Sequence, residues 1–285
     1  MAFCYPDAVA GDAQAASVPE SAPADLWTLG AIGVIAYVLG NLIHEGVGHL
    51  GACVLTGQTP ISVSSVAMEC SRDNQFVLAG GTVANFLAGA LFFLLGRRTG
   101  PRHPHWKFFF WLAMSGNLLS GTGYFLFSGA GGFGDWADFI QGLQPVWAWR
   151  TALAVFGGAS YVIALAFLLR ELQPFVGLRG RAAVPVAQRL CWTPYICGGI
   201  VECLAGLLNP QGMILVALSA AASTFGGSSG LFWGPYWLPG LQRAPATQPL
   251  PIGRSPAWIA TAALLAAAFI AILGPGLRLS ASMHH

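Results

Sequence analysis

The chain has 285 residues, of which 55% are hydrophobic and only 8% are charged. Soluble domains carry about 25% charged residues. The 13 Lys and Arg and 11 Asp and Glu are therefore too few to cover a water-exposed globule of this length, and a polytopic membrane protein is expected. The formal net charge of +2, without a dense basic patch, argues against nucleic-acid binding.

The first 25 residues (1–25) are acidic and lack the basic start and apolar centre of a signal peptide, so we expect a disordered tail. Asp25 is a suitable N-cap for a first helix that begins at Leu26. Since no later linker is long enough to separate domains, residues 26–285 are predicted to form a single transmembrane helical domain.

Long apolar runs predict an all-α fold with about seven transmembrane helices, because a bilayer requires about 20 apolar residues per helix. The segment 60–73 after the first span has a strand-like composition and predicts a small hairpin or an edge strand at the membrane surface. The predicted spans are 26–55, 74–96, 105–128, 146–169, 190–208, 211–233 and 255–277.

The six cysteines do not have the spacing of a disulfide framework. Four of them fall in apolar segments, where thiols pack as small apolar groups. We therefore expect free, buried thiols. The apolar segments hold Cys53, Cys191, Cys197 and Cys203, and the predicted loops hold Cys4 and Cys70.

Most basic residues fall in three predicted loops. If these loops share one side, the positive-inside rule places that side in the cytoplasm. An integral protein of a bacterial inner or plasma membrane, in contact with membrane lipids, is then expected. The loops contain Arg97, Arg98, Arg102 and Lys107, then Arg170, Arg179, Arg181 and Arg189, and finally Arg243 and Arg254.

Ionisable residues at membrane depth are costly and therefore indicate function. The clearest group is His44, Glu45 and His49 near the end of the first span. Neutral imidazoles are zinc ligands, and a neighbouring carboxylate can take a proton from an activated water molecule. A polar cluster that only joins two helices is the structural alternative.

The spacing of the two histidines requires a local distortion of the helix. Residues five apart are separated by about 140° around a regular α-helix, whereas the four-residue spacing of the H-E-x-x-H motif gives about 40°. A π-bulge that absorbs one residue would return His44 and His49 to one face, and Gly46 and Gly48 make this inexpensive. A rival arrangement uses Glu45 and His49 as the ligand pair.

The segment His44-Glu45-Gly-Val-Gly48-His49-Leu resembles the active-site helix of the site-2 protease family of intramembrane zinc metalloproteases. The resemblance continues through the segment Ala79 to Asn85, the Asn117-Leu-Leu segment and the Gly134-Asp135-Trp136 segment. It covers about residues 30 to 140. It implies one Zn²⁺ held by His44, His49 and Asp135, and Glu45 as general base. It also implies that Asn85 or Asn117 binds the substrate backbone or an oxyanion.

The chain differs from the family at several points. The His-Glu-x-x-x-His spacing is one residue longer, the expected proline-rich stretch is absent, and Asp135 is followed by Trp136 in place of glycine. Asp138 is therefore a competing third ligand. Glu202, the other acid at membrane depth, is a further candidate ligand, a proton-relay group or a hydrogen-bonded structural acid. The glycine-rich segment 129–135 predicts a loop that carries Asp135 to the site.

The sequence thus predicts a membrane-embedded zinc metallohydrolase that cleaves a peptide bond of a transmembrane protein or peptide. One alternative is a non-catalytic relative, either a subunit of a membrane complex or a transporter. The other is a di-iron membrane oxygenase. The six histidines, two of them at the chain end, are fewer than the roughly eight that such oxygenases use.

Overall fold

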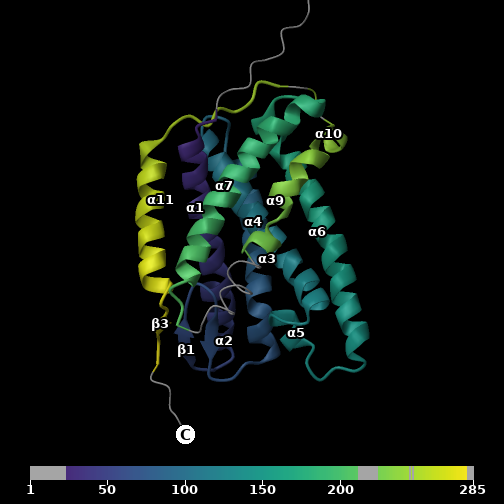
Figure 1. The fold of residues 1–285 in the computed structure, drawn as a ribbon, viewed down its shortest axis with the longest axis vertical. Helices are drawn as coiled ribbons and strands as arrows, with labels where there is room; N and C mark the ends of the chain where they lie inside the picture. Colours follow the sequence, from purple (N-terminus) through teal and green to yellow (C-terminus); the bar gives the residue numbers. More distant parts are fainter. Residues whose placement is uncertain (1–23, 211–223, 244, 246, 281–285) are drawn as a thin grey trace, which may run out of the picture.

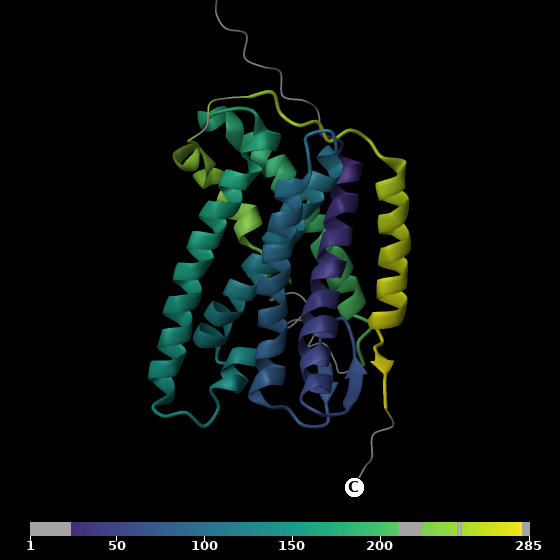
Figure 2. The same ribbon diagram turned by 180° about the vertical axis from the view of Figure 1, so that it is seen from behind.

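A computed structural model describes residues 24–210, 224–243, 245 and 247–280. Figures 1 and 2 show a bundle of long helices with a small sheet at one end. Its longer helices are α1 (Leu26–Asn41), α3 (Gln75–Arg98), α4 (Pro104–Gly131), α6 (Val146–Val176), α7 (Ala183–Gly206) and α11 (Pro256–Ala268).

Shorter elements extend or connect these helices. The π-helix η1 (Leu42–Leu50) and α2 (Gly51–Leu55) continue α1, and the π-helix η5 (Phe269–Leu273) continues α11. The helix α5 (Asp135–Phe139) lies between α4 and α6. The remaining short helices are η2 (Gly180–Ala182), α9 (Gly230–Trp233), η4 (Gly234–Trp237) and α10 (Leu238–Leu241).

Within the described ranges, 4 helices are long and apolar enough to cross a membrane: 26–55, 75–98, 146–176 and 256–273. They correspond to the first, second, fourth and last predicted spans. Helices α4 and α7 occupy the third and fifth predicted positions but are not among these 4. The sixth predicted span is described only from residue 224, and its end forms the short helix α9.

The predicted helix boundaries hold at the first helix and shift elsewhere. The Asp25 carboxylate caps α1 by accepting hydrogen bonds from the backbone N–H and the hydroxyl group of Thr28, each at 2.8 Å. The glycine-rich segment 129–135 is not a loop throughout, because α4 continues to Gly131. The tail 1–23 lies outside the described residues.

The sheet joins segments that are distant in sequence. Its strand order is β2-β1-β3, and both pairings are antiparallel. The hairpin of β1 (Pro60–Val63) and β2 (Met68–Cys70) confirms the strand-like segment after the first span. The third strand, β3 (Leu277–Arg278), was not predicted and ties the chain beyond α11 to this hairpin.

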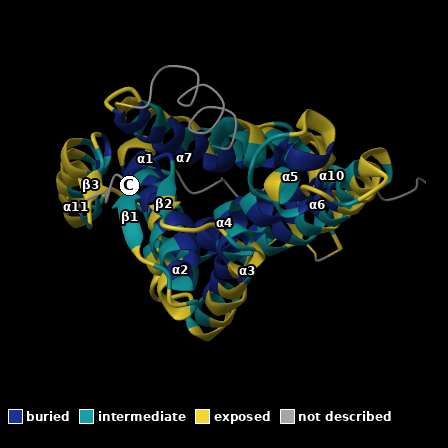
Figure 3. Ribbon diagram, turned by 90° about the horizontal axis from the view of Figure 1, so that it is seen from below, coloured by how far each residue is buried: buried dark blue, intermediate teal, exposed yellow. Residues whose placement is uncertain are grey.

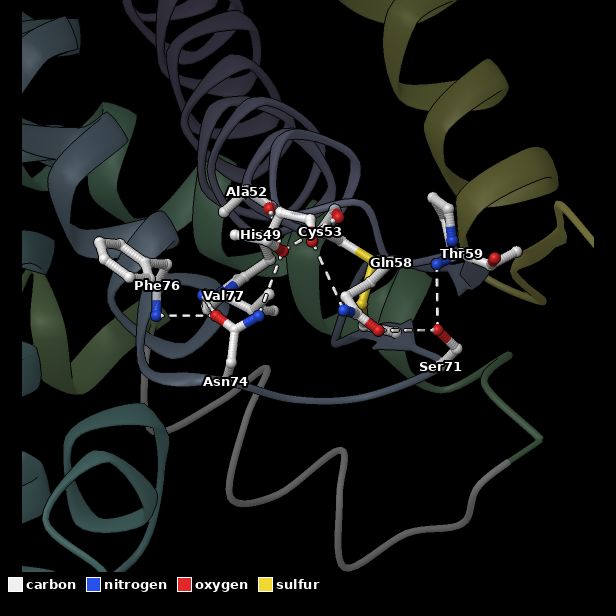
Figure 4. Close-up of a disulfide and its surroundings, with 12 residues drawn as sticks. His49, Ala52, Cys53, Gln58, Thr59, Ser71, Asn74, Phe76 and Val77 are labelled. Atoms are coloured by element: carbon white, nitrogen blue, oxygen red, sulfur yellow. Dashed lines mark hydrogen bonds between the residues drawn. A yellow bond between two sulfur atoms is a disulfide. The ribbon is translucent and has the colours of Figure 1, made fainter.

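The expectation of free thiols is wrong for one pair of cysteines. Cys53 of α2 and Cys70 of β2 form a disulfide across 17 residues of sequence. Cys70 lies in a strand rather than a loop, and the fold of the hairpin back onto α2 brings the two sulfur atoms together (Figure 4). Cys191, Cys197 and Cys203 are free, as expected.

The three basic loops lie together at one end of the bundle, the upper end in Figure 1. The His105 ring nitrogen Nε2 lies 2.8 Å from the Gly253 carbonyl oxygen, which joins the first loop to the third. Gln242 donates to the Leu178 carbonyl at 2.7 Å, which joins the third loop to the second. The sheet, α5 and α2, which carries Cys53 of the disulfide, lie at the opposite end (Figures 1 and 3).

Candidate metal centre

The π-helix η1 brings the two histidines of the motif to one face. Their Nε2 atoms are 3.2 Å apart, although five residues separate them in sequence. The wider π turn accommodates the extra residue, as the spacing predicted. Both side chains are buried, with 7% of their surface exposed. Of the two candidate ligand pairs, the one whose side chains face each other is thus His44 and His49, and not Glu45 and His49.

Asp135 completes the cluster from α5. Its Oδ2 lies 3.4 Å from Nε2 of His44 and 3.3 Å from Nε2 of His49. Gly134 at the N-cap of α5 has φ +86°, a conformation that favours glycine and turns the chain into the short helix. The indole N–H of Trp136 donates to the Thr82 hydroxyl at 2.9 Å and fixes α5 against α3.

The Nδ1 atoms of the two histidines face away from this cluster and also contact polar groups. Nδ1 of His49 lies 2.7 Å from the Val77 carbonyl oxygen, which can only accept, so Nδ1 carries the hydrogen and, in the neutral ring, Nε2 offers a lone pair. Nδ1 of His44 lies 3.1 Å from the Asn85 amide group, and Tyr124 stacks on the His44 ring with centroids 4.8 Å apart. Outer contacts of this kind orient metal-binding histidines.

Glycines let α3 approach the histidines closely. A Cβ atom at Gly81 would lie 2.5 Å from Cε1 of His44 and 2.5 Å from Nε2 of His49. A Cβ atom at Gly48 would lie 2.5 Å from the Gly81 Cα. Any larger residue at Gly81 would therefore displace the rings. Gly48 and Gly81 thus let the two helices pack closely and make room for the cluster.

The start of α3 is fixed to the end of α2, as Figure 4 shows around the disulfide. The Asn74 side-chain oxygen accepts from the backbone N–H groups of Phe76 at 2.9 Å and Val77 at 3.0 Å. Its amide donates to the Thr56 hydroxyl at 3.1 Å. This cap holds the residue whose carbonyl oxygen orients His49.

The electrostatic environments of Asp135 and Asp138 differ. Burial alone would raise the pKa of Asp135, but the His44 and His49 rings outweigh burial and hold that pKa below its ordinary value. The pKa of Asp138 is raised by burial and by the neighbouring carboxylates of Asp135 and Asp73. Asp135 thus remains an anionic donor.

Glu45 lies beside the cluster, buried with 7% of its surface exposed. It interacts electrostatically with the side chains of His49, His44 and Asp135, and the backbone of Met68 in β2 lies against its carboxyl group. Glu45 and His44 both line a cavity inside the bundle. Glu45 therefore lies next to both the cluster and the cavity.

The ligand atoms of His44, His49 and Asp135 all lie within 4.8 Å of one another, so the three residues form a possible metal site. Neither Asp138 nor Glu202 belongs to this group. Asn85 lies against His44, and Asn117 donates to the Ala113 carbonyl of its own helix at 2.8 Å while lining the cavity. Their predicted contact with substrate stays a prediction.

Sequence reasoning missed three contributors to the site. Tyr124 stacks on His44, Val77 offers its carbonyl oxygen to His49, and Thr82 anchors Trp136. Of the three, only the contact of Thr82 left a sign in the sequence, because a tryptophan directly after the candidate ligand needs a partner for its N–H group. A backbone carbonyl leaves no trace in the sequence.

Comparison of the chain with protein-family models, with curated proteins and with solved structures found no match.

Proposed function

We propose that the protein is a membrane-embedded zinc metallohydrolase that cleaves a peptide bond in or near the membrane. The observation that carries this proposal is the triangle of donor atoms formed by His44, His49 and Asp135, with separations of 3.2, 3.3 and 3.4 Å. A tetrahedral zinc ion with bonds of about 2.0 to 2.1 Å requires donor atoms about 3.3 Å apart. The triangle fits this requirement before any ion binds.

The donor chemistry also fits zinc. Two imidazoles and one carboxylate are a common set of protein ligands at catalytic zinc sites, which keep a further position open. Nδ1 of His49 is committed to the Val77 carbonyl, so its Nε2 is free to bind an ion. When Nε2 of His44 binds an ion, its Nδ1 carries the hydrogen and donates, so the Asn85 side chain then presents its amide oxygen.

Glu45 is the residue that would move protons. A zinc ion would supply an activated water molecule and polarise the substrate carbonyl. The Glu45 carboxylate accepts a proton from the attacking water and returns it to the nitrogen of the departing amine. Its burial beside the cluster and at the cavity wall supports this role.

The alternatives explain fewer of these features. A di-iron oxygenase needs more ligands than the one group of three found among the described residues. A non-catalytic subunit or transporter would not require Glu45 to lie next to both the cluster and the cavity. The hydrolase uses each of these features.

We also propose an orientation. The basic loops lie at the opposite end of the bundle from the Cys53–Cys70 disulfide. Positive loops favour the cytoplasmic side, and disulfides persist in oxidising compartments. Both preferences are met when the cluster lies toward the non-cytoplasmic face of a bacterial inner or plasma membrane.

Metal analysis of the purified full-length protein tests the hydrolase. We expect about one zinc per chain. His44→Ala and Asp135→Asn should lose the metal, and the matched variant Asp138→Asn should keep it. Glu45→Gln should keep zinc and lose cleavage of a transmembrane peptide. Two irons per chain would favour the oxygenase, and a protein that binds no metal would contradict the proposal.

A further inference from the structure

A small cavity lies inside the bundle next to the candidate metal centre. Its volume is about 80 Å³. His44 and Glu45 line one part of it, and Glu202 of α7 lines another. Glu202 is 3% exposed and belongs neither to the metal cluster nor to the proton transfer proposed for Glu45. A buried carboxyl group without an assigned role needs a physical account.

Oxygen atoms without a hydrogen-bond partner gather around this cavity. The amide groups of Asn41 and Asn117 donate to backbone carbonyls, which leaves their side-chain oxygens unused. Each unmade bond at a buried polar atom costs free energy. The unpartnered oxygens on cavity-lining residues that do not contact the metal cluster are Asn41 Oδ1, Ser65 Oγ, Asn117 Oδ1 and Glu202 Oε1.

The cavity also has more acidic than basic side chains. Two carboxyl groups, Glu45 and Glu202, line it, and none of the described lining residues is lysine or arginine. Asn41 donates to Oε2 of Glu202 at 3.2 Å, which leaves Oε1 without a partner. A buried carboxylate is stable only when a cation or several donors face it. The cavity therefore lacks a positively charged group that donates hydrogen bonds.

We propose that this cavity binds the primary ammonium group of the substrate, with Glu202 as the counter-ion and the asparagine oxygens as further acceptors. An ammonium group offers three N–H donors and one positive charge, which matches the missing partners. This inference rests on the proposed hydrolase. When the ammonium group of a substrate lies beside Glu202, the rest of the substrate extends toward Glu45 and His44.

The size of the cavity limits what accompanies the ammonium group. A water molecule occupies about 30 Å³ in the liquid, so the cavity holds two or three groups of that size. That space admits an ammonium with one or two carbon atoms. A peptide N-terminus with a small first residue and an ethanolamine headgroup share this chemistry.

Calorimetric binding to the zinc-treated, full-length protein in nanodiscs tests the proposal. The probes are glycinamide and ethanolamine, each compared with a neutral counterpart, N-acetylglycinamide and ethylene glycol. We expect only the ammonium compounds to bind. Glu202→Gln should weaken their binding about thirtyfold, because it removes a buried counter-ion. Tighter binding of glycinamide would identify a peptide N-terminus, and tighter binding of ethanolamine a lipid headgroup.

Glu171→Gln is the matched control, because this glutamate lies in α6 near the basic end of the bundle and does not line the cavity. It should bind the probes like the original protein. If Glu202→Gln does not fold, Asn41→Ala replaces it and should weaken binding about tenfold, through loss of one acceptor and of the contact that holds Glu202.

Several results would overturn the ammonium site. The first is equal binding of charged and neutral probes, and the second is unchanged binding in Glu202→Gln. The third is complete loss of the binding heat of the ammonium probes when sodium chloride is present at the same concentration as the probe. Zinc content is measured on the same samples. Ammonium binding that depends on Glu202 without bound zinc would refute the hydrolase and leave this site standing, and bound zinc without ammonium binding would do the reverse.

Discussion

Glycine makes both the α4–α6 contact and the η1–α3 contact close, yet only the second brings candidate metal ligands together. Where α4 packs on α6, a Cβ atom at Gly157 would overlap the backbone of Leu126, and one at Gly129 would lie 2.5 Å from the Ala154 nitrogen. Where α3 packs on η1, a Cβ atom at Gly81 would overlap the rings of His44 and His49. Backbones approach closely in both cases, but only in the second are candidate ligand atoms packed against the glycine.

The difference lies in what each contact buries. The α4–α6 contact continues into an apolar core that contains Leu165, Leu168 and Leu169. Its polar contacts are paired: the Trp111 indole N–H donates to the Leu168 carbonyl at 3.0 Å, and Arg150 donates to the Gly129 carbonyl at 3.0 Å. The η1–α3 contact buries two imidazoles whose paired Nε2 atoms face a carboxylate. Glycine allows the helices to pack closely, and the polar residues nearby determine whether that contact can form a metal site.

Gly81→Ala should give the largest difference between substitutions at the two helix contacts. The new methyl group would push apart the histidine rings, and we expect loss of stoichiometric metal binding, measured by metal analysis after gel filtration. Gly157→Ala should lower thermal stability and keep the metal. Gly158→Ala, in α6, where a Cβ atom would make only an ordinary contact with the Leu126 side chain at 3.9 Å, is the neutral control. Metal binding in Gly81→Ala equal to that of the original protein would be evidence against this geometry.

Asn85→Ala should weaken metal binding without abolishing it. Outer contacts to metal ligands are worth about 10- to 100-fold in affinity, and Asn85 contacts His44 directly. Competition with a chromogenic chelator measures the change. Asn117→Ala, which removes a buried asparagine that does not contact the ligands, should leave the affinity within about threefold. Equal effects of both substitutions would remove Asn85 from the outer contacts.

Removal of the disulfide should affect stability more than the metal. The double variant Cys53→Ala with Cys70→Ala should lose about 3 kcal/mol of stability, the typical contribution of a crosslink that closes a loop of this length. Thermal unfolding in detergent measures it. Cys203→Ala, at a free thiol, is the control. A double variant as stable as the original protein would show that the hairpin holds without the crosslink.

Asn74→Ala should give the smallest effect. Loss of the cap at the start of α3 costs about 1 kcal/mol. The Val77 carbonyl that orients His49 should also become less fixed, so we expect a decrease of about twofold to fivefold in metal affinity. Stability and chelator competition are measured on one sample. If Asn74→Asp, which keeps the accepting oxygen, restores both quantities, the cap is responsible.

The sequence predicted those features that arise from local pattern. The His-Glu-x-x-x-His spacing required a π turn with two flexible glycines, and η1 has it. The composition of 60–73 indicated strands, and β1 and β2 lie there. Asp135 was named before Asp138 as the third ligand, and the geometry places Asp135 in the cluster. These expectations depended on residues near one another in the chain.

The features that were missed depend on residues distant in sequence. β3 pairs with β1 across more than 200 positions, and the Cys53–Cys70 crosslink required the hairpin to fold back onto α2. Spacing alone gave no reason to pair these two cysteines. The contact of Gly81 with both histidines depends on how α3 packs on η1, which no local pattern encodes.

The π-helix η1 has a consequence for how such sites are compared. One residue added between His44 and His49 leaves their Nε2 atoms 3.2 Å apart, so the donor geometry tolerates an insertion that a fixed-spacing motif does not. After the inserted residue, every following side chain is displaced by one residue relative to a helix with the four-residue spacing. This cluster should therefore be compared with another metal site by superposing the three donor atoms. A sequence alignment without a gap would misplace one of the two histidines.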